Sequence, residues 1–469
     1  MKREEEFARN TAVLAIGKYL PKLFSLITLP IITGRLTQAE YGTYDLITTL
    51  VSLLLPIVTL QIQSAAFRFL IDCREKERES ARIISNIFFF TVAASIITVA
   101  VFFAVYDGVG ILTRLLICGY FFVDILQIAI GMSARGLGYN AVYSANSILN
   151  AGINAVLIFL LVYVKDCGLN GVLLAAMVGN LIAYFYTVHR IRFFRYIHIS
   201  LLSGPVLKEL IAYSWPMIPN NLSNWVLKLS DRLVITAVLG VEANAVYAVA
   251  NKIPTLLAEA QSVVVMGWQE NASVAAKDKD SAAYYSSMFR SMFSLIFAVT
   301  AVLIAAAPVM FAVLIRGDYD AAYAQIPILI IGMFFYCMSG FLGGIYVAHK
   351  RTVSVAVTTV AAAAVNLTID ILLVRRIGIT AGSVSTLIAY LALFLFRMFD
   401  VRRLEKLTCP YGSMLVQLIL LVGMCILAVQ RVPLLNAVNA VLAILASYGF
   451  NRPLVHGFIR KLLNQRKGR

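Results

Sequence analysis

Runs of apolar residues, each about 20 residues long, follow one another along almost the whole chain of 469 residues. An α-helix needs about 20 predominantly apolar residues to cross a bilayer, and in lipid its backbone must satisfy its own hydrogen bonds. The pattern therefore predicts an all-α integral membrane protein with about fourteen transmembrane helices. Their predicted limits are 11–33, 44–66, 83–105, 112–134, 141–164, 171–190, 209–237, 244–268, 289–314, 326–348, 353–374, 380–400, 413–430 and 433–450.

Composition narrows the class of protein further. Hydrophobic residues make up 60% of the chain and charged residues 14%, whereas a soluble protein carries about 25% charged residues. The six cysteines form no C-x-x-C pair, the four histidines form no cluster, and no G-x-x-x-x-G-K-[ST] phosphate loop is present. The sequence therefore predicts no cofactor and no metal site, and its short outer loops predict no enzymatic activity.

Basic residues lie mainly on one side of the predicted spans. With the N-terminus inside, 28 of the 40 Lys and Arg residues, Arg397 among them, fall at inner ends and loops, and seven fall outside. Cytoplasmic loops carry such an excess, so we expect both termini in the cytoplasm. The net charge of +16 then reflects topology, and we expect the lipid bilayer, not nucleic acid, as a partner.

Similar outer turns indicate an internal duplication. Leu36 and Tyr44 recur at the same spacing as Leu239 and Tyr247, and a second pair of turns, GLNG and GITA, follows at a similar shift. Six helices per repeat give both halves the same orientation, so we expect a binding site between them at mid-membrane. The predicted domains are an N-lobe at 1–200, a C-lobe at 201–408, and two added helices with a basic tail at 409–469.

Five basic residues fall inside predicted spans, where each costs about 2.5–3.5 kcal/mol near the bilayer centre. They lie in helices that prolines interrupt or in the span that follows, and interrupted helices at corresponding positions of two halves are typical of a transport site. Two alternatives remain: the lysines of the first span can snorkel to the interface, and Asp231 or Glu259 can neutralise basic neighbours. The five are Lys18 and Lys22 in the first span, Lys228 and Arg232 in the seventh, and Lys252 in the eighth.

Neutral polar residues and small residues also recur at helical spacing within the spans. The amides suit sugar hydroxyls, although hydrogen bonding between helices is an equally good explanation, and the glycines indicate close helix packing. These positions are Asn146, Asn150 and Asn154 in the fifth span, Asn366 with Asp370 in the eleventh, Asp124 with Gln127 in the fourth, and Gly340 with Gly344 in the tenth.

Four segments in a fixed order carry a resemblance to a known family. They are GRLTQAEYGTYDL after the first span, the triplet Ser230-Asp231-Arg232, VYAVANKIP in the eighth span, and NLTIDILLVRRIGITAGS around the eleventh. Over nearly its whole length the sequence resembles the bacterial polysaccharide flippases of the multidrug/oligosaccharidyl-lipid/polysaccharide exporter (MOP) superfamily. Their relative that flips the peptidoglycan precursor also has basic first, seventh and eighth helices and two extra C-terminal helices.

The resemblance implies two six-helix lobes arranged in a V in the bacterial cytoplasmic membrane, alternately open to each side. They would carry an undecaprenyl-diphosphate-linked oligosaccharide to the outer leaflet for polysaccharide biosynthesis, and could contact a polysaccharide polymerase or glycosyltransferases. The implied cavity cations are Lys18, Lys22, Arg232 and Lys252, with Asn150 and Asn154 for the sugar. Basic side chains are the usual partners of phosphate groups.

The source of energy stays open at this stage. An inside-negative potential favours outward movement of an anion by about 2.3 kcal/mol per charge per 100 mV. Antiport of a cation bound at Asp231, Glu259 or Asp370 is the other mechanism.

Two other functions fit parts of the pattern. A cation-coupled multidrug exporter of the same superfamily would need a carboxylate for organic cations, whereas the first span offers two lysines and no acid. A membrane enzyme that polymerises lipid-linked sugars would need a large outer loop, and every predicted outer loop is short.

The charge bias makes a testable prediction about topology. A cysteine introduced at Gln465 should resist an impermeant thiol reagent added to intact cells and should react after permeabilisation, because the tail is expected to be cytoplasmic. The natural Cys167, in a predicted outer turn, is the positive control. Labelling at position 465 from outside intact cells would reverse the predicted orientation.

Overall fold

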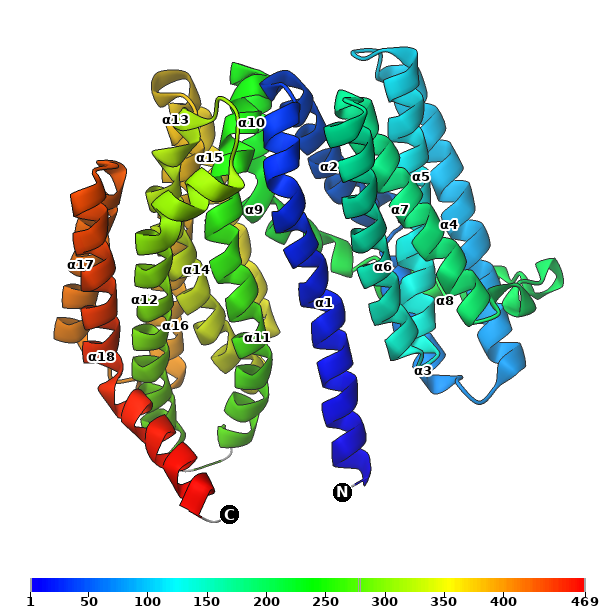
Figure 1. The fold of residues 1–469 in the computed structure, drawn as a ribbon. Coiled ribbons are helices and arrows are strands. Elements are labelled where there is room, and N and C mark those ends of the chain that lie inside the picture. The colour runs from blue at the N-terminus through cyan, green and yellow to red at the C-terminus, as the bar shows by residue number, and fades with distance from the viewer. Residues whose placement is uncertain (1, 277, 279, 468–469) are drawn as a thin grey trace. The chain divides into compact units, whose positions relative to one another are not determined.

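The computed structural model describes residues 2–276, 278 and 280–467, and these residues form eighteen α-helices with short π and 3-10 segments. Twelve of the helices described are long and apolar enough to cross a membrane, so the all-helical, multi-pass membrane architecture is confirmed. The chain divides into two compact units, Met1–Leu222 and Ser223–Arg469. Each is described separately below (Figure 1).

The first unit is built from eight helices. Its longest member, α1, packs along α6, and Gly17 permits the contact because a Cβ there would lie 2.5 Å from the Ser144 Cβ. The helices are α1 (Lys2–Arg35), α2 (Gln38–Val58), α3 (Ile62–Asp72), α4 (Glu77–Val105), α5 (Ile111–Gly136), α6 (Asn140–Ile158) with a π-helical end (Phe159–Val164), α7 (Gly168–Arg190), 3-10 turns at Phe193–Tyr196 and Ile199–Leu201, and α8 (Gly204–Ser214).

The second unit holds the remaining helices, and α9 begins just before it. Its best-buried span is formed by α13 and α14. Of the most apolar 18 residues of this span, 78% are buried inside the protein, so α14 forms the centre of this unit. The helices are α9 (Met217–Leu239), α10 (Val241–Ala250), α11 (Lys252–Ala275), α12 (Ser281–Leu314), α13 (Asp320–Tyr323), α14 (Gln325–Ala348), α15 (Thr352–Ile377), α16 (Thr380–Leu404), α17 (Tyr411–Val429) and α18 (Pro433–Lys467).

Three of the fourteen expected spans are interrupted. The segment 44–66 is divided between α2 and α3 at residues 59–61, and the other two interruptions lie near the start of the second unit. The segment 209–237 is divided between α8 and α9 at Trp215 and Pro216, and the segment 244–268 is divided between α10 and α11 at Asn251. Proline lacks the backbone N–H that a continuous helix needs. These helices are also polar, since α9 alone carries Lys228, Asp231 and Arg232. They are therefore absent from the twelve apolar spans among the described residues.

Corresponding helices pack in the same pairs within each unit. In the first unit α5 packs against α4 and α7, and α6 packs against α7; in the second, α14 packs against α12 and α16, and α15 packs against α16. This order is what a duplicated six-helix unit would produce, because the same sequence pattern buries the same helix faces.

A capping box fixes the start of α2 at the turn that follows α1. The Thr37 side chain accepts a hydrogen bond from the Glu40 backbone N–H, and the Glu40 carboxylate accepts one from the Thr37 backbone N–H. The same carboxylate accepts a hydrogen bond from the Leu169 N–H at the start of α7. A reciprocal cap satisfies two backbone groups that the helix leaves unpaired, so the motif TQAE forms a rigid turn.

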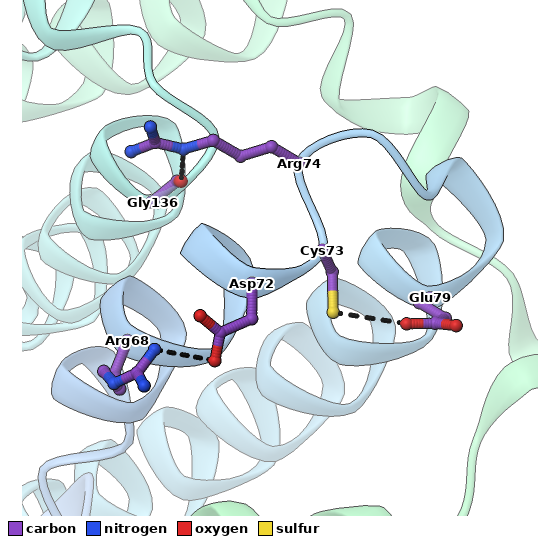
Figure 2. A network of polar contacts seen from close by, with 6 residues as sticks. All are labelled: Arg68, Asp72, Cys73, Arg74, Glu79 and Gly136. Atoms are coloured by element: carbon purple, nitrogen blue, oxygen red, sulfur yellow. Dashed lines mark hydrogen bonds and ion pairs between the residues drawn. The ribbon is translucent and has the colours of Figure 1, made fainter.

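Three polar contacts lie at the connection between α3 and α4, one of them within the last turns of α3 (Figure 2). Arg68 pairs with Asp72 at 2.7 Å, the Arg74 Nε donates to the Gly136 carbonyl at 2.8 Å, and the Cys73 thiol donates to Glu79. Burial, together with the hydrogen bond to Glu79, raises the pKa of the Cys73 thiol. This charged segment is therefore an ordered turn, with a thiol of reduced acidity.

The Gly340-x-x-x-Gly344 pattern of α14 is confirmed as a packing feature. A Cβ at Gly340 would lie 2.5 Å from the Gln261 Nε2, and one at Gly344 would lie 2.5 Å from the Trp268 ring. Both side chains come from α11 and donate hydrogen bonds of 2.8 Å to α14 carbonyls, those of Cys337 and Phe341. The glycines thus allow α11 to approach α14 closely.

This contact predicts the effect of filling the groove. Gly344→Ala should destabilise the purified protein by about 1–3 kcal/mol, the usual cost of overpacking, because the Trp268 ring must move and its hydrogen bond is lost. Thermal unfolding in detergent measures the change. Gly423→Ala is the matched control, since a Cβ there meets nothing within 4 Å; equal stability of the two variants would contradict the prediction.

Candidate functional site

Two aspartates from different helices of the second unit lie in one buried cluster. Asp231 of α9 is 2% exposed and Asp370 of α15 is 0% exposed, and their carboxylates interact electrostatically. One oxygen of Asp231, Oδ2, accepts hydrogen bonds from the Tyr247 and Thr386 hydroxyls, both at 2.6 Å. Within the described part of the chain, Asp231 Oδ1 and both oxygens of Asp370 lack a hydrogen-bond partner.

Neutral side chains complete the surroundings of the two acids. Asn366, also on α15, accepts a hydrogen bond from the Ser230 hydroxyl at 3.1 Å, and its amide lies 3.5 Å from the Thr386 hydroxyl. The Tyr247 ring packs over Gly382, where a Cβ would come within 2.9 Å of it. Helices α9, α10, α15 and α16 therefore all contribute to the cluster.

The electrostatics of this cluster call for an additional positive charge. Arg232, the next residue to Asp231 on α9, interacts electrostatically with the Asp231 carboxylate, but one guanidinium group cannot balance two carboxylates. Two ionised carboxylates in a low-dielectric interior repel each other, and hydroxyl and amide donors do not compensate a full charge. A shared proton or a small cation would supply the missing charge, and carboxylate, hydroxyl and amide oxygens are ligands for hard cations. The described residues contain no group of three or more His, Cys, Asp or Glu side chains suited to a metal ion.

The predicted coupling acids thus fall in two places. Asp231 and Asp370 share the buried cluster, whereas Glu259 lies half-buried on α11. The Asp231 carboxylate bonds to hydroxyls and interacts electrostatically with Arg232. The Lys228 ammonium lies 5.0 Å from the centre of the Tyr336 ring.

The predicted cavity cations are divided between the two units. In the first, Lys18 and Lys22 are both exposed on the apolar helix α1, and the Lys18 ammonium lies 5.5 Å from the centre of the Tyr19 ring. In the second, Arg232 and Lys252 are half-buried on α9 and α11. Residues four apart lie on one helix face, so the two lysines of α1 present adjacent positive charges.

Asparagines of α6 form hydrogen bonds between helices, the alternative that the sequence left open. The Asn150 amide donates to the Asn180 carbonyl oxygen at 2.6 Å, and the Asn180 amide donates to Asp124 at 3.0 Å. Asn146 donates to the Ala183 carbonyl at 2.9 Å. Within the described residues the buried Asn154 Oδ1 has no hydrogen-bond partner. The stripe therefore joins α5, α6 and α7.

Some polar positions of these clusters escaped the sequence analysis. Tyr247 stood out as part of a repeated turn, without a link to Asp231, and Thr386 and Asn180 were not singled out. Arg397 was counted among the inner-side basic residues, but it is 6% exposed within α16 and donates to the Ser339 carbonyl at 2.8 Å. The sequence shows each of these polar residues within an otherwise apolar run, and that was the signal that could have found them. It does not show which residue of another helix each one contacts.

Comparison with known families identifies the chain. The sequence profile of the family described as polysaccharide biosynthesis protein matches residues 7–268, which is more than half of the chain and includes α9 and α10. The chain belongs to this family. No curated protein matches the sequence.

Solved structures place this polysaccharide biosynthesis protein in the MOP superfamily fold. It is similar to an inward closed conformation of the lipid II flippase MurJ, with a TM-score of 0.70, 14% identity, and coverage of 96% of this chain and 100% of that one. An inward-facing multidrug resistance MATE transporter has a TM-score of 0.68 and 14% identity, and the match covers 84% of this chain and 98% of that one. A third similar structure is a MOP superfamily transporter from Pyrococcus furiosus, which is described as having a binding pocket of reverse polarity. Its TM-score is 0.58 and its identity 13%, and the match covers 86% of this chain and 96% of that one.

Proposed function

We propose that this protein is a flippase that moves a lipid-linked oligosaccharide from the inner to the outer leaflet of a bacterial cytoplasmic membrane by alternating access. Family membership supplies the link to polysaccharide biosynthesis. The observation that carries the proposal is the pair of exposed lysines, Lys18 and Lys22, on an apolar membrane helix. Exposed ammonium groups in a span are costly, and an anionic substrate gives them a function.

The chemistry of the substrate fits these groups. A polyisoprenoid diphosphate carries about two negative charges at neutral pH, and Lys and Arg are its natural partners because they form charge-assisted hydrogen bonds. Arg232 and Lys252 would extend the basic set from the second unit. On α6, the helix that packs against α1, Asn154 would offer its amide to sugar hydroxyls, because its Oδ1 has no hydrogen-bond partner among the described residues. The Asn150 amide would have to release Asn180 before it could do the same.

The buried acids favour a coupling role over drug binding. A multidrug exporter needs a carboxylate that an organic cation can reach, whereas Asp231 and Asp370 are enclosed by four helices and are almost without exposure. Only a proton or a small ion fits such a place. We therefore propose that cation binding at this cluster, with Asn366, Thr386 and Tyr247 as neutral partners, drives or resets the transport cycle.

The basic residues yield a test of the substrate class. Lys22→Ala and Lys252→Ala should each abolish export of the lipid-linked oligosaccharide in reconstituted vesicles, while Lys22→Arg should retain part of it because the charge is kept. The readout is the fraction of a fluorescent lipid-linked sugar that becomes accessible on the opposite leaflet. Lys165→Ala, an exposed lysine beyond the π-helical end of α6, is the control. Full export by the double alanine variant would refute the assignment.

The acid cluster yields a test of coupling. With sodium as the probe, the unchanged protein should gain about 2.7 kcal/mol of stability at a sodium concentration about 100 times the Kd, and Asp370→Asn should lose that gain. Thermal unfolding in sodium chloride and in choline chloride of equal ionic strength measures it, with the exposed Asp107→Asn as control.

The opposite results have distinct meanings for transport. Sodium stabilisation that persists in Asp370→Asn would exclude this cluster as the ion site. A flipping rate that depends on membrane potential alone, and is unchanged in Asp231→Asn and Asp370→Asn, would favour electrophoretic movement of the substrate over antiport.

A further inference from the structure

A basic pocket lies where α7 leaves the membrane-spanning part of the first unit. Its volume is about 730 Å³, and it extends from the last turns of α7 into the 3-10 turn Phe193–Tyr196. Three arginines and one histidine line it together with apolar side chains. The lining residues are Phe185, Val188, His189, Arg190, Arg192, Phe194 and Arg195.

The position of this pocket corresponds to the level of the lipid headgroups. The apolar span of α7 ends at Arg190, so the lining passes from the span into the segment beyond it. Phe185 on the span is 54% exposed, and Phe194 beyond it is 68% exposed. Aromatic and basic side chains gather at this level in membrane proteins because one part of the site is apolar and the other is wet.

The segment that forms the outer wall lies beside α4 (Figure 1) and is bonded to it. The Ser85 hydroxyl donates to the Tyr196 carbonyl at 2.8 Å and accepts from the His198 N–H at 3.0 Å. Asn86 accepts from the Ser203 N–H at 3.0 Å, and the Phe193 ring packs on Phe88 with 5.6 Å between centroids. The wall is therefore preorganised, which reduces the entropy cost of binding a ligand.

Only one of the three arginines of the pocket forms an ion pair among the described residues. Arg195 forms an ion pair with Glu77 at the start of α4. Among the described residues, neither Arg190 nor Arg192 has an ion-pair partner, and both are exposed. Arg192 adopts a left-handed conformation with φ of 53°, which ends α7 and turns the chain into the 3-10 segment. Two guanidinium groups thus border an apolar wall at the membrane surface.

We propose that this pocket binds the phosphate headgroup of an anionic phospholipid, with Arg190 and Arg192 on the phosphate and an acyl chain along Phe185, Val188 and Phe194. Guanidinium groups bind phosphate oxygens through paired hydrogen bonds. A basic site beside an exposed apolar span suits a ligand that is anionic at one end and apolar at the other. The site is independent of the proposed transport pathway, because its residues are not among those assigned to substrate or coupling ion.

A lipid titration tests the proposal on the full-length protein. Native mass spectrometry in detergent would measure binding of phosphatidylglycerol and of phosphatidylcholine with identical acyl chains. We expect phosphatidylglycerol to bind more tightly, and we expect the double variant Arg190→Gln/Arg192→Gln to weaken its binding about thirtyfold, since each basic side chain contributes about fivefold at an anionic lipid surface. The double variant Arg403→Gln/Lys406→Gln, which removes two exposed charges elsewhere, should bind within about twofold of the unchanged protein.

Two further arms separate the sources of the phosphate chemistry. Phe194→Ser should also weaken phosphatidylglycerol binding while leaving the arginines in place, and excess inorganic phosphate should fail to displace the lipid. Size-exclusion profiles would verify that each variant is folded. The proposal is overturned if Arg190→Gln/Arg192→Gln binds phosphatidylglycerol unchanged, if phosphatidylcholine binds equally well, or if inorganic phosphate displaces the lipid, which would make this a site for free anions.

Discussion

Charged side chains are expensive inside a helical membrane protein, and this cost organises the polar groups of the whole structure. A carboxylate or ammonium group in a low-dielectric interior needs a counter-charge, several hydrogen bonds, or access to water. Arg397 is held by acceptors on α14 and α15, with a carbonyl at 2.8 Å and the Thr359 hydroxyl at 3.1 Å. Lys18 and Lys22 have exposed side chains on α1. Among the residues that the structure describes, only the cluster of Asp231 and Asp370 combines deep burial with unsatisfied carboxylate oxygens.

The polar groups of the two units therefore have different roles. Asn146 and Asn150 are bonded to α7, so they stabilise the arrangement of helices in the first unit. Within the described part of the second unit, Asp231 and Asp370 together have hydrogen-bond donors on one carboxylate oxygen and none on the other three. A cluster whose negative charge is only partly compensated changes its stability when a cation binds or leaves, and this free-energy difference is what couples ion binding to a change of conformation.

Interruptions of two helical segments determine where the buried acid Asp231 lies. The breaks at Pro216 and Asn251 divide two segments that would otherwise be continuous spans, and the polar helix α9 between them carries Asp231. Interrupted helices in transporters bring polar groups and free backbone ends to the middle of the bilayer. Gly382 contributes in a different way, because its missing side chain lets the Tyr247 ring reach the Asp231 carboxylate across α16.

Apolar runs, turn motifs and basic loops determined the class of this protein from the sequence alone, because a bilayer imposes helix length, hydropathy and charge asymmetry on any chain that crosses it. The Gly340-x-x-x-Gly344 packing site was also predictable from the sequence, because two glycines four residues apart lie on one face of a helix. Only the tertiary structure decided which polar residues meet. Asp231, Tyr247, Asp370 and Thr386 come from four helices separated by up to 155 residues, and nothing in local spacing records that contact. The pocket at Arg190 likewise depends on hydrogen bonds from α4 to a segment more than 100 residues later, because helix packing, and not periodicity, sets distances between distant parts of a chain.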